Sequence, residues 1–165
     1  MIKRACTPVA LPVIVTLILC ALFANASYAA TAKEIDVSVD VALERFHNEV
    51  KGGKEFLKNA KGVLVFPSVF KAGIGIGGEY GEGALRINGK TVDYYNTAAA
   101  SIGFQLGAQK KTVILVFMQN DALKKFRDSA GFEVGVDGSV ALVELGAGGS
   151  IDTTNIKSPI VAFIF

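Results

Sequence analysis

The chain has 165 residues, with 17 lysines and arginines against 15 acidic residues and a formal net charge of +2. This balance excludes a strongly basic nucleic-acid binder, and the length favours a single domain with a substantial core. Both cysteines, Cys6 and Cys20, lie near the N-terminus. The rest of the chain can therefore form neither a disulfide nor a thiolate metal site.

The first 29 residues have the pattern of a cleavable export signal. Lys3 and Arg4 precede a mostly apolar run from Val9 to Phe23, which is shorter than the about 20 residues needed to span a bilayer. The small residues that follow predict cleavage after Ala29, with Ala26 as the alternative. We weighed an uncleaved anchor and a lipoprotein against this interpretation and disfavour both. We expect a mature domain of residues 30–165 in the periplasm or associated with the envelope.

Two helices are expected at the start of the mature region. Apolar residues at helical spacing predict a helix over Ala32 to Val50, although part of the same segment also alternates as a strand would; the stripe is Ile35, Val39, Ala42, Phe46 and Val50. Gly52-Gly53 would end this helix. A second, short helix is expected from Lys54 to Ala60, with its apolar residues on one side.

Strand signals begin after Gly62. Asn88-Gly89 predicts a tight hairpin turn, and Pro67 is expected to stop the first strand. The expected strands are Val63 to Phe66, Ala84 to Ile87, Lys90 to Tyr95, Ser101 to Ala108 and Val113 to Met118, with a glycine-rich segment from Gly73 to Gly83.

The last part of the chain predicts one more helix and further strands. Asn120-Asp121 is expected to cap a helix from Ala122 to Ser129. Phe132 to Leu145 is expected to form two strands around an Asp137-Gly138 turn, and Ile160 to Phe165 a final strand. The predicted fold is α+β: N-terminal helices packed on a largely antiparallel, curved or barrel-like, glycine-rich sheet with one inserted helix.

No pattern of residues predicts a catalytic, metal or cofactor site. Gly73 to Gly78 matches the glycine spacing of a dinucleotide site, but more glycines and two carboxylates follow it where that motif requires a helix. His47 is the only histidine, too few for a triad or a transition-metal site. The carboxylate pairs Glu79/Glu82 and Asp137/Glu144 could serve a hydrolase, but solvated turn residues are the favoured interpretation.

Lysines give the clearest functional signal. Four of them recur at intervals of three, four and three: Lys51, Lys54, Lys58 and Lys61. A basic helix face beside an apolar one is typical of a helix that lies on anionic lipid headgroups. A solvated face of a core-packing helix explains the same spacing, and the residues alone favour it. Three further lysines could join this surface, namely Lys71, Lys110 and Lys111. The aromatic residues Phe70, Tyr94 and Tyr95 could lie at a membrane interface or cover the core.

Several segments together resemble the SYLF domain, also described as the actin-binding Las-seventeen-binding regulator domain. The run Ser101-Ile102-Gly103-Phe104-Gln105-Leu106-Gly107-Ala108-Gln109 is similar to its central signature. Further matching segments are Lys61 to Pro67, Lys71 to Gly78, Gly83 to Leu85, Asp121 to Phe126 and Gly135 to Ala141. The resemblance covers about Ala32 to the end of the chain.

The resemblance implies a non-catalytic module that binds phospholipid. Eukaryotic members bind phosphoinositides and some bind actin, whereas bacterial members are exported and are thought to bind envelope phospholipid. Lipid binding in the family is tied to a basic N-terminal helical region, which implies a role for Lys51, Lys54, Lys58, Lys61 and Lys71 here. We expect an anionic membrane surface as partner, and neither actin nor nucleic acid.

An envelope protein is the alternative partner. Family members usually continue past the strand that matches Val161 to Phe165, with a further turn and strand. The sequence therefore leads us to expect an unpaired edge at Phe165, which could pair with another protein.

Overall fold

The computed structural model describes residues 30–129, 140–145 and 157–165, and of residues 74–76 and 101–106 it describes the backbone alone. The expected export signal and the Asp137-Gly138 turn lie outside these ranges. Residues 31–165 form one compact unit. Its elements are α2 (Ala32–Glu49), α3 (Gly53–Lys58), β1 (Gly62–Ile87), β2 (Lys90–Phe117), α4 (Asn120–Asp128), β3 (Val140–Glu144) and β4 (Ile160–Ile164). None of the helices in these ranges is both long and apolar enough to cross a bilayer.

Helix α2 confirms the predicted apolar stripe. Thr31 and Glu34 form a capping box, in which the Thr31 N–H donates to Glu34 Oε2 at 2.7 Å and the Glu34 N–H donates to Thr31 Oγ1 at 3.3 Å. This exchange satisfies backbone donors that a helix N-terminus otherwise leaves open. The stripe residues of α2 are buried, and so is Val50, which follows the helix in extended conformation.

Strands β1 and β2 form one long antiparallel ribbon, joined by the predicted turn. Asn88 and Gly89 both have positive φ, 52° and 76°, as this kind of turn requires. The expected series of short strands is wrong, because each half of the ribbon is continuous. Pro67 does not end β1: the register shifts between Phe66 and Val69, and a bulge at a sheet edge accommodates a residue that has no N–H to donate.

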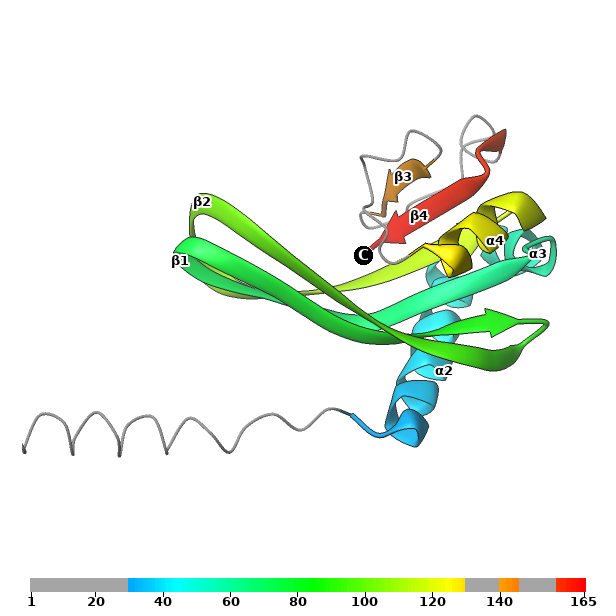
Figure 1. Ribbon diagram of the computed structural model, residues 1–165, viewed down its shortest axis with the longest axis horizontal. Helices are drawn as coiled ribbons and strands as arrows, with labels where there is room; N and C mark the ends of the chain where they lie inside the picture. Colours follow the sequence, from blue (N-terminus) through cyan, green and yellow to red (C-terminus); the bar gives the residue numbers. More distant parts are fainter. Residues whose placement is uncertain (1–29, 130–139, 146–156) are drawn as a thin grey trace, which may run out of the picture. The chain divides into compact units, whose positions relative to one another are not determined.

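The ribbon folds back on itself near its glycine-rich middle, as Figure 1 shows at the end labelled β1 and β2. Gly81 and Gly83, two residues apart on one strand face, lie against the first half of the same strand. A Cβ at Gly83 would lie 2.2 Å from the carbonyl oxygen of Val65, and one at Gly81 would lie 2.9 Å from that of Ser68. Glycine at both positions therefore permits the two halves of β1, which we call its first and second arms, to lie close together.

The sheet has the strand order β1-β2-β4-β3. Strand β4 pairs antiparallel with β2 and parallel with β3, so the described sheet is mostly antiparallel and open. The expectation of an unpaired edge at Phe165 is wrong, because β4 lies inside the sheet. Thr112 and Phe165 exchange backbone hydrogen bonds of 2.7 and 3.1 Å.

Two apolar clusters form the core, on opposite faces of the sheet. Helices α2 and α3 cover one face, where the rings of Phe46 and Phe163 meet at 4.9 Å between centroids. Helix α4 covers the other, where Phe126 packs on Phe117 at 5.0 Å. Helix α4 begins two residues earlier than predicted, and its N-cap is Gln119, which forms no side-chain capping bond. Packing of Leu123 and Phe126 therefore holds this helix in place rather than a cap.

Candidate functional site

A pocket of about 380 Å³ lies where α2, α3 and the β1–β2 turn meet. Because the ribbon folds back on itself, the end of β1 and the β1–β2 turn lie beside the start of β1, and all three line the pocket. Helix α2 contributes Leu43 and His47, and α3 contributes Lys54, Leu57 and Lys58. The remaining lining residues are Ala60, Gly62, Val63, Arg86, Asn88 and Gly89.

The inner part of this pocket is apolar. Leu43, Leu57, Ala60 and Val63 are partly buried and pack against the core cluster under α2. Apolar walls with a few polar groups at fixed positions are typical of small-molecule sites. The pocket thus has the general composition of a ligand site.

Two exposed lysines, one turn apart on α3, border the pocket. Lys58 Nζ lies 2.8 Å from Glu55 Oε1, with both side chains well exposed, so this pair contributes little to stability and leaves Lys58 available. Lys54 forms no ion pair with any residue that the structure describes. Both predicted lysines of the short helix therefore present their ammonium groups at one site.

Arg86 is a third cation of the pocket, and the sequence pattern did not single it out. Its Nη1 donates to the carboxylate of Asp40, and its Nη2 donates to the carbonyl oxygen of Asp36 at 3.2 Å. The third nitrogen of the guanidinium, Nε, is buried and has no acceptor among the described residues. Arg86 lies beside α2 only because the second half of β1 folds back along the first.

Asp36 fastens α2 to the ribbon beside Arg86. Its carboxylate accepts hydrogen bonds from Thr91 Oγ1 at 2.7 Å and from the Tyr94 hydroxyl at 2.9 Å. These two bonds, together with Arg86, lower the pKa of Asp36. Tyr94 is thus held by α2, while its ring stays partly exposed.

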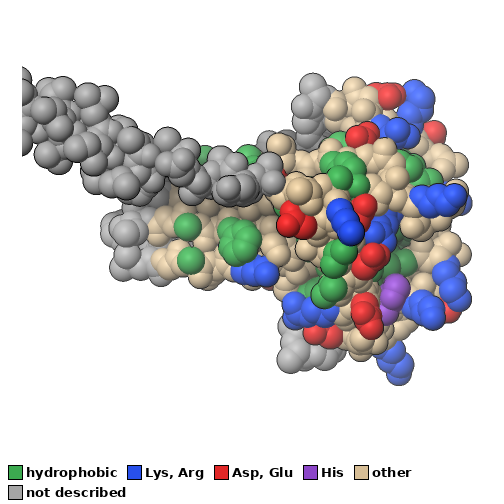
Figure 2. All heavy atoms as spheres, turned by 90° about the horizontal axis from the view of Figure 1, so that it is seen from below, with side chains coloured by type: hydrophobic (Ala, Val, Ile, Leu, Met, Phe, Trp, Pro, Cys, Tyr) green, Lys and Arg blue, Asp and Glu red, His purple; other side chains and the backbone are tan. Residues whose placement is uncertain are grey.

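His47 lies at the same pocket beside Lys54. Burial lowers the pKa of His47, and the charge of Lys54 lowers it further, so the imidazole is neutral at neutral pH. Figure 2 shows the only histidine of the chain, in purple, with blue lysine or arginine side chains next to it. Protonation of His47 would add positive charge to a site that is already basic.

The other lysines predicted for this surface are dispersed. Lys51 lies between α2 and α3, and Lys61 lies between α3 and β1; both are exposed and neither lines the pocket. Lys71 lies on the first arm of β1, where its Nζ is 3.4 Å from Glu79 Oε1. Lys111 binds the other oxygen of the same carboxylate. The structure therefore brings Lys54 and Lys58 together and places Lys71 in a separate ion-pair cluster.

The candidate carboxylate pair does not form an acid–base site. The hydrogen bond from Lys111 and the nearby charges lower the pKa of Glu79, which opposes a role as general acid at neutral pH. Glu82 accepts a hydrogen bond from the Tyr80 hydroxyl at 2.9 Å. Asp137 lies outside the described residues. Within the described ranges, no three His, Cys, Asp or Glu side chains gather as metal ligands would.

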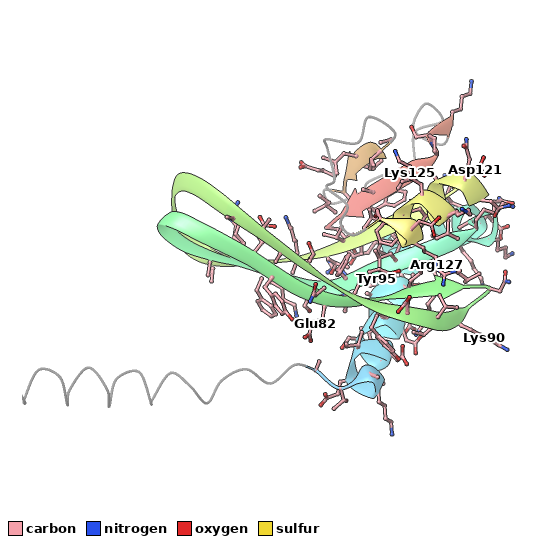
Figure 3. The ribbon with its side chains drawn as sticks, in the orientation of Figure 1. Glu82, Lys90, Tyr95, Asp121, Lys125 and Arg127 are labelled. Atoms are coloured by element: carbon pink, nitrogen blue, oxygen red, sulfur yellow. The ribbon has the colours of Figure 1, made fainter. Side chains whose placement is uncertain are left out.

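The aromatic candidates fall into two groups. Phe70 is exposed, and Lys110 Nζ lies 5.6 Å from its ring centroid. Tyr95 instead packs on Phe126 of α4, and burial raises its pKa. Figure 3 shows Tyr95 and Arg127 close together between β2 and α4. Tyr95 is therefore partly buried against the core, whereas Phe70 remains exposed at the surface.

A second groove, of about 490 Å³, lies on the other flank of α2. Val37 and Val41 of α2 line it and are 56% and 62% exposed. Arg45 also lines it and lies over the ring of Phe165, 4.9 Å from the centroid. These exposed aliphatic side chains lie outside the buried stripe of α2.

Part of the chain matches a known protein family. Residues 98–164 match the family described as Ysc84: Las17-binding protein actin regulator. No curated protein matches the chain. The matched segment contains the second arm of β2, then α4, β3 and β4, so all residues of the pocket precede it.

Proposed function

We propose that this chain, whose residues 98–164 match the SYLF (Ysc84) family that its sequence resembles, binds anionic phospholipid membranes peripherally and catalyses no reaction. One observation carries the proposal: the short helix α3 has a basic outer side above an apolar inner one. Lys54 and Lys58 are exposed, whereas Phe56 of the same helix is only 7% exposed.

Electrostatic attraction would provide much of the affinity. A lysine near an anionic bilayer surface contributes about 1 kcal/mol, and Lys51 and Lys61 flank α3 at either end. Shallow insertion of apolar groups would add to this, since interfacial helices combine both contributions. The proposed location is the cell envelope, where the expected export signal would direct the domain.

The test is co-sedimentation of residues 30–165 with vesicles of graded anionic lipid content. Binding should rise with the anionic fraction and fall with added salt, because salt screens exposed charges. Reversal of two charges on α3, Lys54→Glu with Lys58→Glu, should weaken binding at least tenfold and leave the fold intact. The matched control is Lys124→Glu with Lys125→Glu on α4, which changes the net charge equally and should bind nearly as the unmodified protein does.

Two outcomes would count against the proposal. Equal loss in both double variants would indicate that net charge alone decides binding. Failure of the folded protein to bind any vesicle would favour an envelope protein as the partner.

A further inference from the structure

We infer that the pocket between α2, α3 and the β1–β2 turn binds one molecule of an anionic amphiphile, with the charged head at the cations and the start of an acyl chain on the apolar wall. The inference rests on the proposed function for the class of ligand. It adds a discrete site of defined stoichiometry, which attraction to a charged surface does not require.

The size of the pocket fits this ligand. Its volume of about 380 Å³ lies within the about 300–1,000 Å³ typical of small-molecule sites. This space accommodates a phosphate-bearing head and the first part of one chain. It is too small for two full-length chains, which would have to remain in the bilayer.

The cations at the pocket define the charge of the head. Lys54 has no ion-pair partner among the described residues, and the Lys58 ammonium is held only by an exposed pair. Arg86 also lines the pocket, but its Nη1 and Nη2 are bonded to α2 and its Nε is buried. Lys54 and Lys58 are therefore the cations that can bind an anionic oxygen.

The opposite wall defines the rest of the ligand. Leu43, Leu57 and Val63 present aliphatic groups, which gain nothing from a fully hydrated anion. A free phosphate would therefore contact only the cations, and a neutral lipid would leave Lys54 without an ion-pair partner among the described residues. An anionic amphiphile, which has a charged head and an apolar chain, would contact both the cations and the aliphatic wall.

The inference is tested with soluble lipid below its critical micelle concentration, so that no membrane surface is present. Residues 30–165 are titrated calorimetrically with dihexanoyl phosphatidylglycerol. The comparison ligands are dihexanoyl phosphatidylcholine, with the same chains and no net charge, and glycerol 3-phosphate, with charge and no chain. Saturable one-to-one binding of the first, at least tenfold tighter than either comparison ligand, is the expected result.

Two variants locate the site. Lys54→Gln should lower the affinity about tenfold, as loss of one charged hydrogen bond would. Val63→Thr, which keeps the side-chain shape, should lower it a few-fold. The matched control Lys33→Gln removes an exposed lysine from the first turn of α2 and should have no effect.

The inference and the proposed function can fail separately. Binding to vesicles without binding of the soluble lipid would overturn the inference that the pocket holds a ligand, but would still support the proposed binding to a membrane surface. Equal binding of glycerol 3-phosphate would reduce the site to an anion site and also overturn the inference. Loss of affinity in Lys33→Gln equal to that in Lys54→Gln would place the ligand elsewhere.

Discussion

The Nζ of Lys111 lies 2.7 Å from Oε2 of Glu79 and joins the end of β2 to the returning arm of β1. Lys71, on the first arm, holds the other oxygen of the same carboxylate. Glu79 is only 16% exposed, so these ion pairs are better protected from solvent than those on the helices. One carboxylate thereby holds both ends of the fold-back together.

Replacement of Glu79 by glutamine should destabilise the domain and change its dependence on pH. Lys111 lowers the pKa of Glu79 below its usual 4.5. The ionised Glu79 therefore contributes fully to the free energy of unfolding above pH 4.5, and this contribution is lost as the pH falls through the lowered pKa. We expect Glu79→Gln to lower the free energy of unfolding by about 1–2 kcal/mol at neutral pH. Urea denaturation at pH 7 and at pH 3 measures both effects.

At the acidic pH the difference between Glu79→Gln and the unmodified protein should become smaller. The control is Glu44→Gln, at an exposed position of α2, which should leave the unfolding midpoint unchanged. A constant difference across this pH range would show that the loss of stability does not come from the charge of Glu79.

Alanine at Gly83 should destabilise the domain through steric overlap. The new methyl group would lie 2.2 Å from the Val65 carbonyl oxygen and 2.7 Å from a ring carbon of Phe66. Because the Val65 backbone cannot shift without disturbing the sheet, we expect the free energy of unfolding to fall by about 1–3 kcal/mol, the usual cost of overpacking. The unfolding midpoint in urea is the measurement.

The matched control for this variant is Gly78→Ala in the same strand. There the nearest atom, the Ala99 carbonyl oxygen, would be 3.9 Å from the new Cβ, which is ordinary contact. Its midpoint should remain close to that of the unmodified protein. Similar losses in both variants would argue that glycine matters here for backbone freedom and not for close packing.

Local patterns in the sequence predicted the local structure well. The stripe of α2 follows from its 3.6-residue period, and the Asn88-Gly89 turn follows from the tolerance of these residues for positive φ. The curvature of the glycine-rich sheet was also expected, and the ribbon bends near the glycine-rich middle of β1. Each of these features depends on residues close together in the chain.

Features that depend on distant contacts were not predicted. Pro67 was expected to stop a strand, but an edge position and a bulge accommodate it. Phe165 was expected at an edge, but its pairing with Thr112 depends on the place of β4 between β2 and β3. Arg86 was not predicted as a residue of the pocket, because only the fold-back of β1 brings it close to the lysines of α3. Strand neighbours and sites built across them are decided by tertiary packing.

Acidification should strengthen binding of an anionic amphiphile at the pocket, through His47. Burial and Lys54 lower the pKa of His47 below its usual 6.5, so the free protein holds this side chain neutral at pH 7.5. Lys54 and Lys58 of α3 and Arg86 of β1 line the pocket with it, and an anion bound among them would favour the protonated form. Binding and protonation would then reinforce each other.

The affinity for dihexanoyl phosphatidylglycerol should therefore rise about three- to tenfold from pH 7.5 to pH 5, as one added charge at close range would produce. This ligand suits the measurement because its phosphodiester does not titrate in that range. The variant His47→Gln should match the unmodified protein at pH 7.5 and lose most of the increase at pH 5. An unchanged increase in this variant would assign the pH dependence to another group, because the charge at position 47 would then have no part in it.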